Sequence, residues 1–353
     1  MAYPQCCTSS TACPVEFHPT AFLSQGPVTL PCSSTTFQFN TIVPPNGQHY
    51  TSGRDMAIIH YNQSTSAVLQ GEIRAGDELF ILETTSNGTM WSQEPEDTYR
   101  LDGEDDHNPA PTPAGDSTTM YTVTATFYYT PQFKDITPDI PAFVTEILAL
   151  TNQAYANSGI SMTLSLHCLQ EAEGLNDVVD RKQMLQQFGD YKPSLRELLQ
   201  SADIAVLLVG SMNRCGRATM LGLTEQPEPR TTLVVRKDCA LPYFSLAHEV
   251  AHLVGAAHHG QSNPPYHHGR GHYWKADHGK FYSTILGNTF GKTRLNVFSA
   301  PQQSLYGYQL AAGSKVDADN TQVINTNRMA LSMVGDELES CNFKGERLLG
   351  MIL

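Results

Sequence analysis

Residues 247–259 read AHEVAHLVGAAHH, and their spacing of histidines and glutamate is the most informative pattern in the chain. His248 and His252 are four residues apart, so on a helix their imidazoles leave the same face one turn apart. Two neutral imidazoles at that distance can share one zinc ion. Glu249 follows His248 directly, which places a carboxylate beside the metal, where it can take a proton from water. The stretch therefore predicts a helix that carries a catalytic zinc site.

The residues after this helix supply a third candidate ligand. Gly255 comes three residues after His252, and a glycine there can adopt a left-handed conformation that ends the helix and turns the chain. His258 arrives three residues later and can return to the metal. Three protein ligands leave the fourth position open for water, as in catalytic zinc sites. His259 is the alternative third ligand, and the spacing favours His258.

Four more histidines follow in a segment rich in Gly, Pro and Tyr. These histidines could support the ligands of the first site, line a substrate-binding rim, form an extra metal site or be ordinary surface residues. These residues are His267, His268, His272 and His278.

The charge balance argues against one class of partner. The chain has 22 basic and 35 acidic residues, a formal net charge of −13. Such an acidic chain is a poor binder of a phosphate backbone, so we expect no nucleic-acid partner. No run approaches eighteen apolar residues, so we expect no membrane span. The sequence defines no oligomeric state.

The start of the chain and its cysteines bear on its destination. Residues 1–20 lack the positive n-region and the apolar h-region of a secretory signal peptide. Either this is a mature or engineered start, or the protein is exported without a cleaved signal. The eight cysteines form no CxxC pair, so we expect no cysteine zinc ribbon. Their even number favours disulfides and an extracellular, secreted protein, with buried free thiols as the alternative.

Two domains and a linker are predicted. Residues 1–106 form a small β-rich domain, because short apolar segments alternate there with Gly, Ser, Asn and Asp turns. Residues 107–118, rich in Pro, Ala and Gly, are the predicted linker. The first 118 residues hold three basic and fourteen acidic residues, whereas the remainder is almost neutral, which supports separately built units. We interpret the first unit as a propeptide, a targeting module or a binding unit. Its predicted strands include Ala57–Tyr61, Ala67–Ile73 and Glu78–Glu83.

Residues 119–353 alternate between the strand period and the helix period, which is typical of an α/β layered domain. A later helix is expected to place Met329 and Met333 in the core. Helices are predicted at Ile140–Ser158, which Gly159 ends, and over part of Gln183–Leu199. Strands are predicted at Tyr121–Tyr129, Met162–Leu166, Ile204–Val209 and Leu233–Val235.

The chain resembles the metzincin superfamily of zinc endopeptidases, whose signature HExxHxxGxxH is matched from His248 to His258. Over roughly residues 119–335 it is similar to the reprolysin-like and peptidyl-Asp metallopeptidase branch. The first 118 residues resemble no family that we can name. Beyond the signature, the similar stretches are Asn152–Ile160, Ala202–Gly210, Cys215–Gly216, Val234–Glu249, Arg294–Pro301 and Ala318–Ser332.

The resemblance implies an α/β (α+β) catalytic domain with a twisted, mostly parallel sheet, an active-site helix and a smaller C-terminal subdomain. Substrate would lie in a cleft between the two subdomains, with the segment Glu225–Arg230 near its edge. The resemblance also implies that Cys215 and Cys239 pair and brace the strand that leads into the active-site helix.

Three positions depart from the family pattern, and one of them is His259, where related branches often have Asp, Glu, Ser or Pro. Metzincins carry a methionine in a tight turn beneath the zinc, and the matching segment Ser283–Gly287 has Leu286 at that position. Leucine and methionine have similar volumes, so we expect the apolar floor to survive and zinc to bind. Asn288 stands where astacin-like and serralysin-like members have a tyrosine, so we expect no tyrosine ligand.

The activity that the resemblance implies is that of a zinc-dependent endopeptidase. One catalytic Zn²⁺ would be held by His248, His252 and His258, and Glu249 would act as general base towards a zinc-activated water. The substrates would be proteins or peptides. Three alternatives stay open: a catalytically silent binding protein on a metzincin scaffold, an exported toxin or effector protease, and a zinc hydrolase with a non-peptide substrate.

Three cysteines near the start, Cys6, Cys7 and Cys13, leave regulation open. One of them could reach the zinc as a thiolate and hold the enzyme latent. Disulfide pairing within the first unit is the alternative, and it is the interpretation that we favour.

Overall fold

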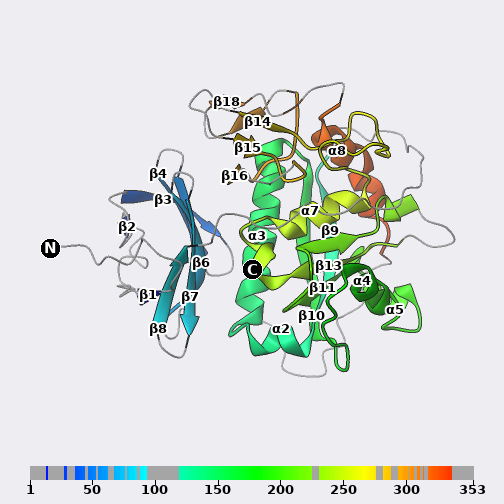
Figure 1. Ribbon diagram of the computed structural model, residues 1–353, viewed down its shortest axis with the longest axis horizontal. Coiled ribbons are helices and arrows are strands. Elements are labelled where there is room, and N and C mark those ends of the chain that lie inside the picture. The colour runs from blue at the N-terminus through cyan, green and yellow to red at the C-terminus, as the bar shows by residue number, and fades with distance from the viewer. Residues whose placement is uncertain are drawn as a thin grey trace. The chain divides into compact units, whose positions relative to one another are not determined.

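The structure is a computed structural model (Figure 1). It describes residues 119–224, 230–275, 281–287, 293–301, 313 and 317–335, together with the backbone of two short strands at 303–310 and of the strands within residues 13–93. The predicted linker at 107–118 and residues 225–229, which the resemblance places near the cleft edge, lie outside this part of the chain.

The chain divides into two compact units. The first comprises Met1–Glu96, Thr137–Ala149 and Leu348–Leu353, and the second comprises Asp97–Ile136 and Leu150–Arg347. The domain boundaries expected from the sequence, 1–106, 107–118 and 119–353, stay a prediction.

Eight strands of the first unit form one antiparallel sheet in the order β1-β8-β7-β6-β5-β4-β3-β2. From β3 to β8 each strand pairs with the next, which makes a meander. The three strand segments predicted from the sequence fall within β5, β6 and β7. The strands are β1 (Cys13–Pro14), β2 (Val28–Thr29), β3 (Thr36–Val43), β4 (Gly47–Ser52), β5 (Asp55–Asn62), β6 (Ala67–Ala75), β7 (Glu78–Thr85) and β8 (Gly88–Gln93).

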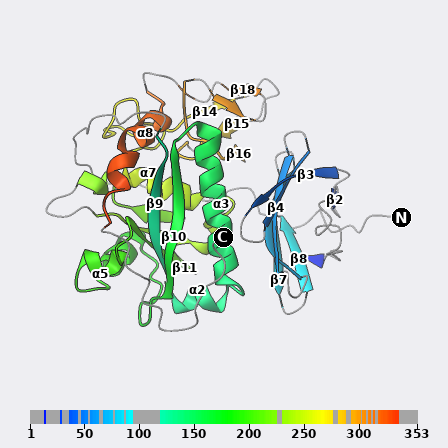
Figure 2. The ribbon, with the colours of Figure 1, turned by 180° about the vertical axis from the view of Figure 1, so that it is seen from behind.

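The second unit is built on a five-stranded sheet in the order β10-β9-β11-β13-β12. Four strands are parallel, and β12 pairs antiparallel with β13 at one edge. Figure 2, seen from behind, shows β9 and β10 side by side. The expected mixed α/β class with a mostly parallel sheet is therefore confirmed. The strands are β9 (Tyr121–Tyr129), β10 (Met162–Glu171), β11 (Ile204–Val209), β12 (Gly216–Ala218) and β13 (Thr232–Arg236).

Helices connect these strands and follow them. The helices are α2 (Pro131–Asp135), α3 (Ile140–Ser158), α4 (Arg181–Gly189), α5 (Leu195–Leu199), the 3₁₀ turn η2 (Gly222–Thr224), α6 (Lys237–Ala240), α7 (Ser245–Leu253) and α8 (Asn320–Leu331). Two small sheets lie between α7 and α8 in the chain. Their strands are β14 (Tyr273–Lys275), β15 (Phe281–Ser283) and β16 (Thr293–Arg294), then β17 (Gln303–Leu305) and β18 (Tyr308–Leu310).

The core of the second unit lies on β11 and β13, whose residues are all buried, as expected of strands covered on both faces. On one face, Leu207 of β11 belongs to a cluster with Phe188 of α4 and Tyr128 of β9. The Tyr128 hydroxyl donates a hydrogen bond to the carbonyl oxygen of Leu198 at 2.9 Å. Burial raises the pKa of Tyr128 to about 12, because the phenolate would lose its hydration.

Three elements begin and end where the sequence predicts: β9, α3 and β11. Gly159 ends α3 in a left-handed conformation with φ of 67°, as expected. The helical stretch predicted over 183–199 is interrupted between α4 and α5, where Pro193 stands. Ser194 then caps α5, since its hydroxyl accepts the Glu197 N–H at 3.2 Å.

The expectation that Met329 and Met333 belong to the core is wrong. Their exposed fractions are 42% and 67%, and Met333 lies beyond the last residue of α8. The buried positions of α8 include two asparagines, Asn320 and Asn327, besides apolar residues such as Val323. Among the described residues, no helix combines the length and the apolar character that crossing a membrane requires.

Candidate metal centre

Helix α7 carries three of the predicted site residues, and all nine of its residues are buried. The helix lies against β12 and β13 of the sheet. Phe244 precedes it in a left-handed conformation, with φ of 54°, and the Phe244 carbonyl accepts the His248 N–H at 3.0 Å. Because a buried helix shows no polar side chain to bulk water, these side chains need partners inside the protein.

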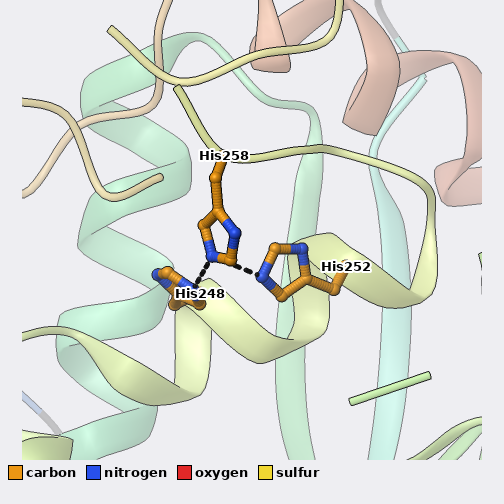
Figure 3. Close-up of side chains that lie close together, drawn as sticks. All are labelled: His248, His252 and His258. Carbon is orange, nitrogen blue, oxygen red and sulfur yellow. Dashed lines mark hydrogen bonds between the residues drawn. The ribbon is translucent and has the colours of Figure 1, made fainter. Parts of the chain in front are cut away.

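The three predicted histidine ligands converge on one point (Figure 3). Nε2 of His258 lies 2.9 Å from Nε2 of His248 and 3.1 Å from Nε2 of His252. The first two rings of the signature leave consecutive turns of α7, and the His258 ring reaches them from the loop that follows. Among the described residues, these three form the one group of His, Cys, Asp or Glu side chains that could hold a metal ion.

The other ring nitrogens of the helical histidines are fixed by backbone carbonyls. Nδ1 of His248 lies 3.0 Å from the carbonyl oxygen of Ile285, and Nδ1 of His252 lies 2.8 Å from that of Ala256. A carbonyl oxygen can only accept, so each Nδ1 carries the proton. Nε2 of each ring then presents a lone pair towards the shared point, which is the tautomer that a metal ligand needs.

The geometry of these donors fits a metal ion. Two nitrogens that bind one zinc ion tetrahedrally, with bonds of roughly 2.0–2.1 Å, lie about 3.3 Å apart. The observed separations from His258 are 2.9 and 3.1 Å, so only a small adjustment is needed. A set of three imidazoles suits first-row transition metals better than Mg²⁺ or Ca²⁺, which prefer oxygen ligands.

Gly255 turns the chain from α7 towards His258. Its φ is 91°, so it has the left-handed conformation expected from the sequence. Space is also limiting, because a Cβ at this position would lie 2.8 Å from Cδ1 of Leu221 and 2.9 Å from Cε2 of Tyr266. Backbone conformation and packing therefore both require glycine in this turn.

The turn Ser283–Gly287 contacts the histidine segment through two backbone carbonyl groups. Its Ile285 carbonyl orients His248, and its Leu286 carbonyl accepts the N–H of His259 at 3.0 Å. The Leu286 side chain is fully buried. The turn thus contacts the chain on both sides of the histidine cluster, with leucine at the position where the resemblance places methionine.

Glu249 is 2% exposed, and its carboxylate lies over the backbone of Gly216 in the edge strand β12. A Cβ at Gly216 would lie 2.7 Å from both Cγ and Cδ of Glu249 and closer still to Oε1. The absence of a side chain on Gly216 therefore makes the space that the Glu249 carboxylate occupies.

A disulfide joins Cys215, which precedes β12, to Cys239 in α6, as the resemblance implies. The Cys239 carbonyl accepts a hydrogen bond from Oγ of Ser245, the first residue of α7, at 2.9 Å. The covalent link therefore ties the edge strand beside Glu249 to the segment that enters α7. Cys168 is disulfide-bonded as well.

The neighbouring histidines stay out of the cluster. Nδ1 of His259 lies 3.3 Å from the Gly271 carbonyl oxygen, and its ring meets Tyr273 edge-on at 4.4 Å between centroids. His272 stacks on Trp274, with ring centroids 6.1 Å apart. His267 and His268 do not join the metal-binding group either, while His278 and the side chains of Cys6, Cys7 and Cys13 lie outside the described residues.

Sequence reasoning missed the groups that orient the site. Ile285 and Ala256 act through backbone carbonyls, which every residue has, so no side-chain pattern could reveal them. Gly216 could be found only as part of a Cys-Gly pair in a similar stretch. The position of a glycine beside a carboxylate depends on strand order, which the sequence does not state.

Comparison with known proteins connects the chain to named peptidases. No protein-family model matches the chain. A peptidyl-Asp metalloendopeptidase of Stenotrophomonas maltophilia (strain R551-3) is 30% identical over 195 residues, which cover 52% of this chain and 46% of that protein. A protein of the same name from Xanthomonas campestris pv. campestris is 30% identical over 187 residues, 50% of this chain and 43% of that protein. The chain thus spans about half the length of these curated relatives.

Solved structures match more loosely. A chain from a structure titled as a chaperone–substrate complex gives a TM-score of 0.49 at 17% identity, over 75% of this chain and 39% of that chain. Metalloproteinase-II from Bacteroides fragilis gives 0.35 at 15% identity, over 64% of this chain and 77% of that one. The relationship rests on the sequence relatives: this chain is related to metallopeptidases.

Proposed function

We propose that the chain is a zinc-dependent endopeptidase of the metzincin type. The observation that carries the proposal is the convergence of three imidazole nitrogens beside a buried glutamate. His248 and His252 present Nε2 to the same point as His258, and Glu249 follows the first of them on the same helix. The names of the sequence relatives, which are metalloendopeptidases, support the same reaction class.

The proposed mechanism assigns one task to each group. When bound, a zinc ion lowers the pKa of water and polarises a carbonyl group. His248, His252 and His258 hold the ion, and the carbonyls of Ile285 and Ala256 keep the first two rings in the required tautomer. Glu249 accepts the proton of the attacking water and delivers it to the leaving amine. Its burial keeps competing water away from this carboxylate.

A peptide substrate fits the surroundings of Glu249. The strand β12 is the edge of the five-stranded sheet, and its Gly216 contacts Glu249. An extended peptide can add to such an edge through backbone hydrogen bonds, which would bring a peptide bond to the metal. This placement supports protein or peptide substrates over a non-peptide substrate.

We further propose that the protein works outside the cell. The disulfide Cys215–Cys239 and the disulfide-bonded Cys168 support an oxidising destination. The preference for Asp in the relatives' names is theirs, and we do not extend it to this chain. Cleavage-site profiling on a peptide library would define the preference of this enzyme.

The substitution Glu249→Gln tests the proposed mechanism. The amide cannot accept the proton, so peptide cleavage should fall by at least a hundredfold, while about one zinc per chain is retained. The measurements are kcat/KM on a denatured protein substrate and metal content after dialysis. Glu197→Gln, at an exposed residue of α5, is the matched control and should leave both unchanged.

Two results would contradict the mechanism. If the Glu249→Gln protein cleaves peptides at the rate of the unsubstituted chain, Glu249 is not the general base. Zinc-loaded unsubstituted protein without any peptidase activity would instead favour a silent binding protein on the same scaffold.

A further inference from the structure

Helix α8 places two buried asparagines against the turn between the metal-site histidines. Asn320 and Asn327 are seven residues apart, or two helical turns, so they share one face of α8. Both are fully buried. A buried amide needs hydrogen-bond partners inside the protein. For these two side chains the partners include the carbonyl oxygens of Val254 and Ala257, at the two ends of the segment Val254–Ala257.

Asn327 holds the beginning of this segment. Its Nδ2 donates to the carbonyl oxygen of Val254 at 3.0 Å and lies 2.8 Å from the hydroxyl oxygen of Tyr266. The Tyr266 ring is one of the two groups that enclose Gly255. Asn327 therefore fixes both the residue before the left-handed glycine and the aromatic ring that packs on that glycine.

Asn320 holds the end of the segment. Its Nδ2 lies 2.7 Å from the carbonyl oxygen of Gly269 and 3.4 Å from that of Ala257, the residue before His258. Its Oδ1 lies 3.0 Å from Oγ of Ser299. One amide thus joins α8, the Gly269 backbone and the residue that leads into the third histidine.

The backbone around Ala257 completes the arrangement. The Ala257 N–H donates to the Gly269 carbonyl at 2.7 Å, and the Ala257 carbonyl accepts the Gly271 N–H at 2.9 Å. Ala256, within the same segment, supplies the carbonyl that fixes the tautomer of His252. A shift of this segment would therefore move His258 and disturb a second ligand at once.

We propose that Asn320 and Asn327 are positioning residues that preorganise the metal site by fixing the turn from His252 to His258. The inference rests on the proposed function in that it takes the three histidines as metal ligands. Both positions require a donor, because each side chain faces backbone carbonyl oxygens. An aspartate has nearly the same shape but offers only acceptors when ionised, so it would repel these carbonyls.

The experiment measures metal affinity in the full chain with Asn320→Asp and with Asn327→Asp. Zn²⁺ alone is titrated against a chelator, and Co²⁺ alone is added to record its visible absorption, which depends on coordination geometry. Loss of groups that orient metal ligands commonly weakens binding by roughly 10- to 100-fold. We expect a loss in that range for each variant and a changed Co²⁺ spectrum.

Asn325→Asp is the matched control on the same helix. Asn325 bonds to the Gly159 carbonyl and to the Ser161 N–H, away from the metal-binding turn. The same chemical change there should leave the Zn²⁺ affinity within about twofold and the Co²⁺ spectrum unchanged. Ser299→Ala, which removes the hydroxyl beside Oδ1 of Asn320 without adding charge, decides the question if the two aspartate variants do not fold, and should lower the affinity by about tenfold.

The outcomes separate the inference from the proposed function. If the unsubstituted chain binds neither Zn²⁺ nor Co²⁺ at the histidines, the proposed function fails. If it binds them, and the folded Asn320 and Asn327 variants keep its affinity and its Co²⁺ spectrum, the inference is overturned. An equal loss in the Asn325 variant would also overturn it, because the effect would then belong to the helix as a whole.

Discussion

The Glu249 carboxylate lies against the backbone of Gly216, so close that it occupies the space that a Cβ on Gly216 would need. The strand and the helix that bring these residues together are joined by the disulfide Cys215–Cys239 through α6. The position of Glu249, the proposed general base, therefore depends on an edge strand as well as on the helix that carries the HExxH residues.

Gly216→Ala should displace Glu249 while leaving the histidines in place. A shift of about 1 Å in a catalytic group can cost roughly a hundredfold in rate, so kcat/KM should fall by about 10- to 100-fold, with metal content unchanged. Gly189→Ala is the matched control, since nothing lies within 4 Å of its Cβ position. Unaltered kcat/KM in the Gly216 variant would contradict the account of how Glu249 is held.

Leu286 is fully buried in the turn Ser283–Gly287, where the resemblance expects a methionine to form the apolar floor of the site, and leucine and methionine have similar volumes. Leu286→Met should change the free energy of unfolding by less than about 1.5 kcal/mol and should keep the metal. Leu286→Ala should cost about 2–5 kcal/mol, because it leaves a cavity at a fully buried position. Urea denaturation measures both values. A methionine variant as unstable as the alanine variant would show that the floor requires leucine.

Stability at alkaline pH should depend on Tyr128. Its pKa is about 12 in the folded chain and close to 10 when unfolded, so the unfolded state loses the proton first. The contribution of the buried hydroxyl is therefore complete below pH 10 and declines as the pH rises towards 12. Free energies of unfolding between pH 9 and 12 should fall more steeply in the unsubstituted chain than in Tyr128→Phe. Parallel curves for the two proteins would refute the assignment.

Much of the structure from residue 119 onwards follows from local patterns. The alternation in Tyr121–Tyr129 and the apolar run Ile204–Val209 define strands whose ends the structure reproduces. Ile140–Ser158 is predicted as one helix because its apolar spacing and Gly159 act over neighbouring residues. The prediction for Met329 is wrong because α8 buries two asparagines and exposes this methionine. Hydrophobicity alone predicts a buried methionine and exposed asparagines.

In the site, as in the fold, the parts that depend on neighbouring residues are predictable from the sequence, whereas the parts that depend on distant segments are not. The spacing from His248 to His258 is enough to predict a cluster, because α7 and the Gly255 turn are local structures. The groups that orient this cluster, such as the Ile285 carbonyl and the Asn320 amide, come from distant segments that only the folded chain brings together. Their positions depend on tertiary packing, for which a single sequence offers no spacing rule.

A comparison of His258→Ala with His259→Ala tests whether His248, His252 and His258 together hold the metal ion. The metal content of each full-length protein is measured after equilibration with Zn²⁺ and dialysis, alongside the unsubstituted chain. We expect about one zinc in the unsubstituted chain and in His259→Ala, and a loss of zinc in His258→Ala, because His258, and not His259, places Nε2 beside the other two imidazoles. Zinc that persists in His258→Ala and disappears in His259→Ala, or an unsubstituted chain that binds no zinc, would contradict this expectation.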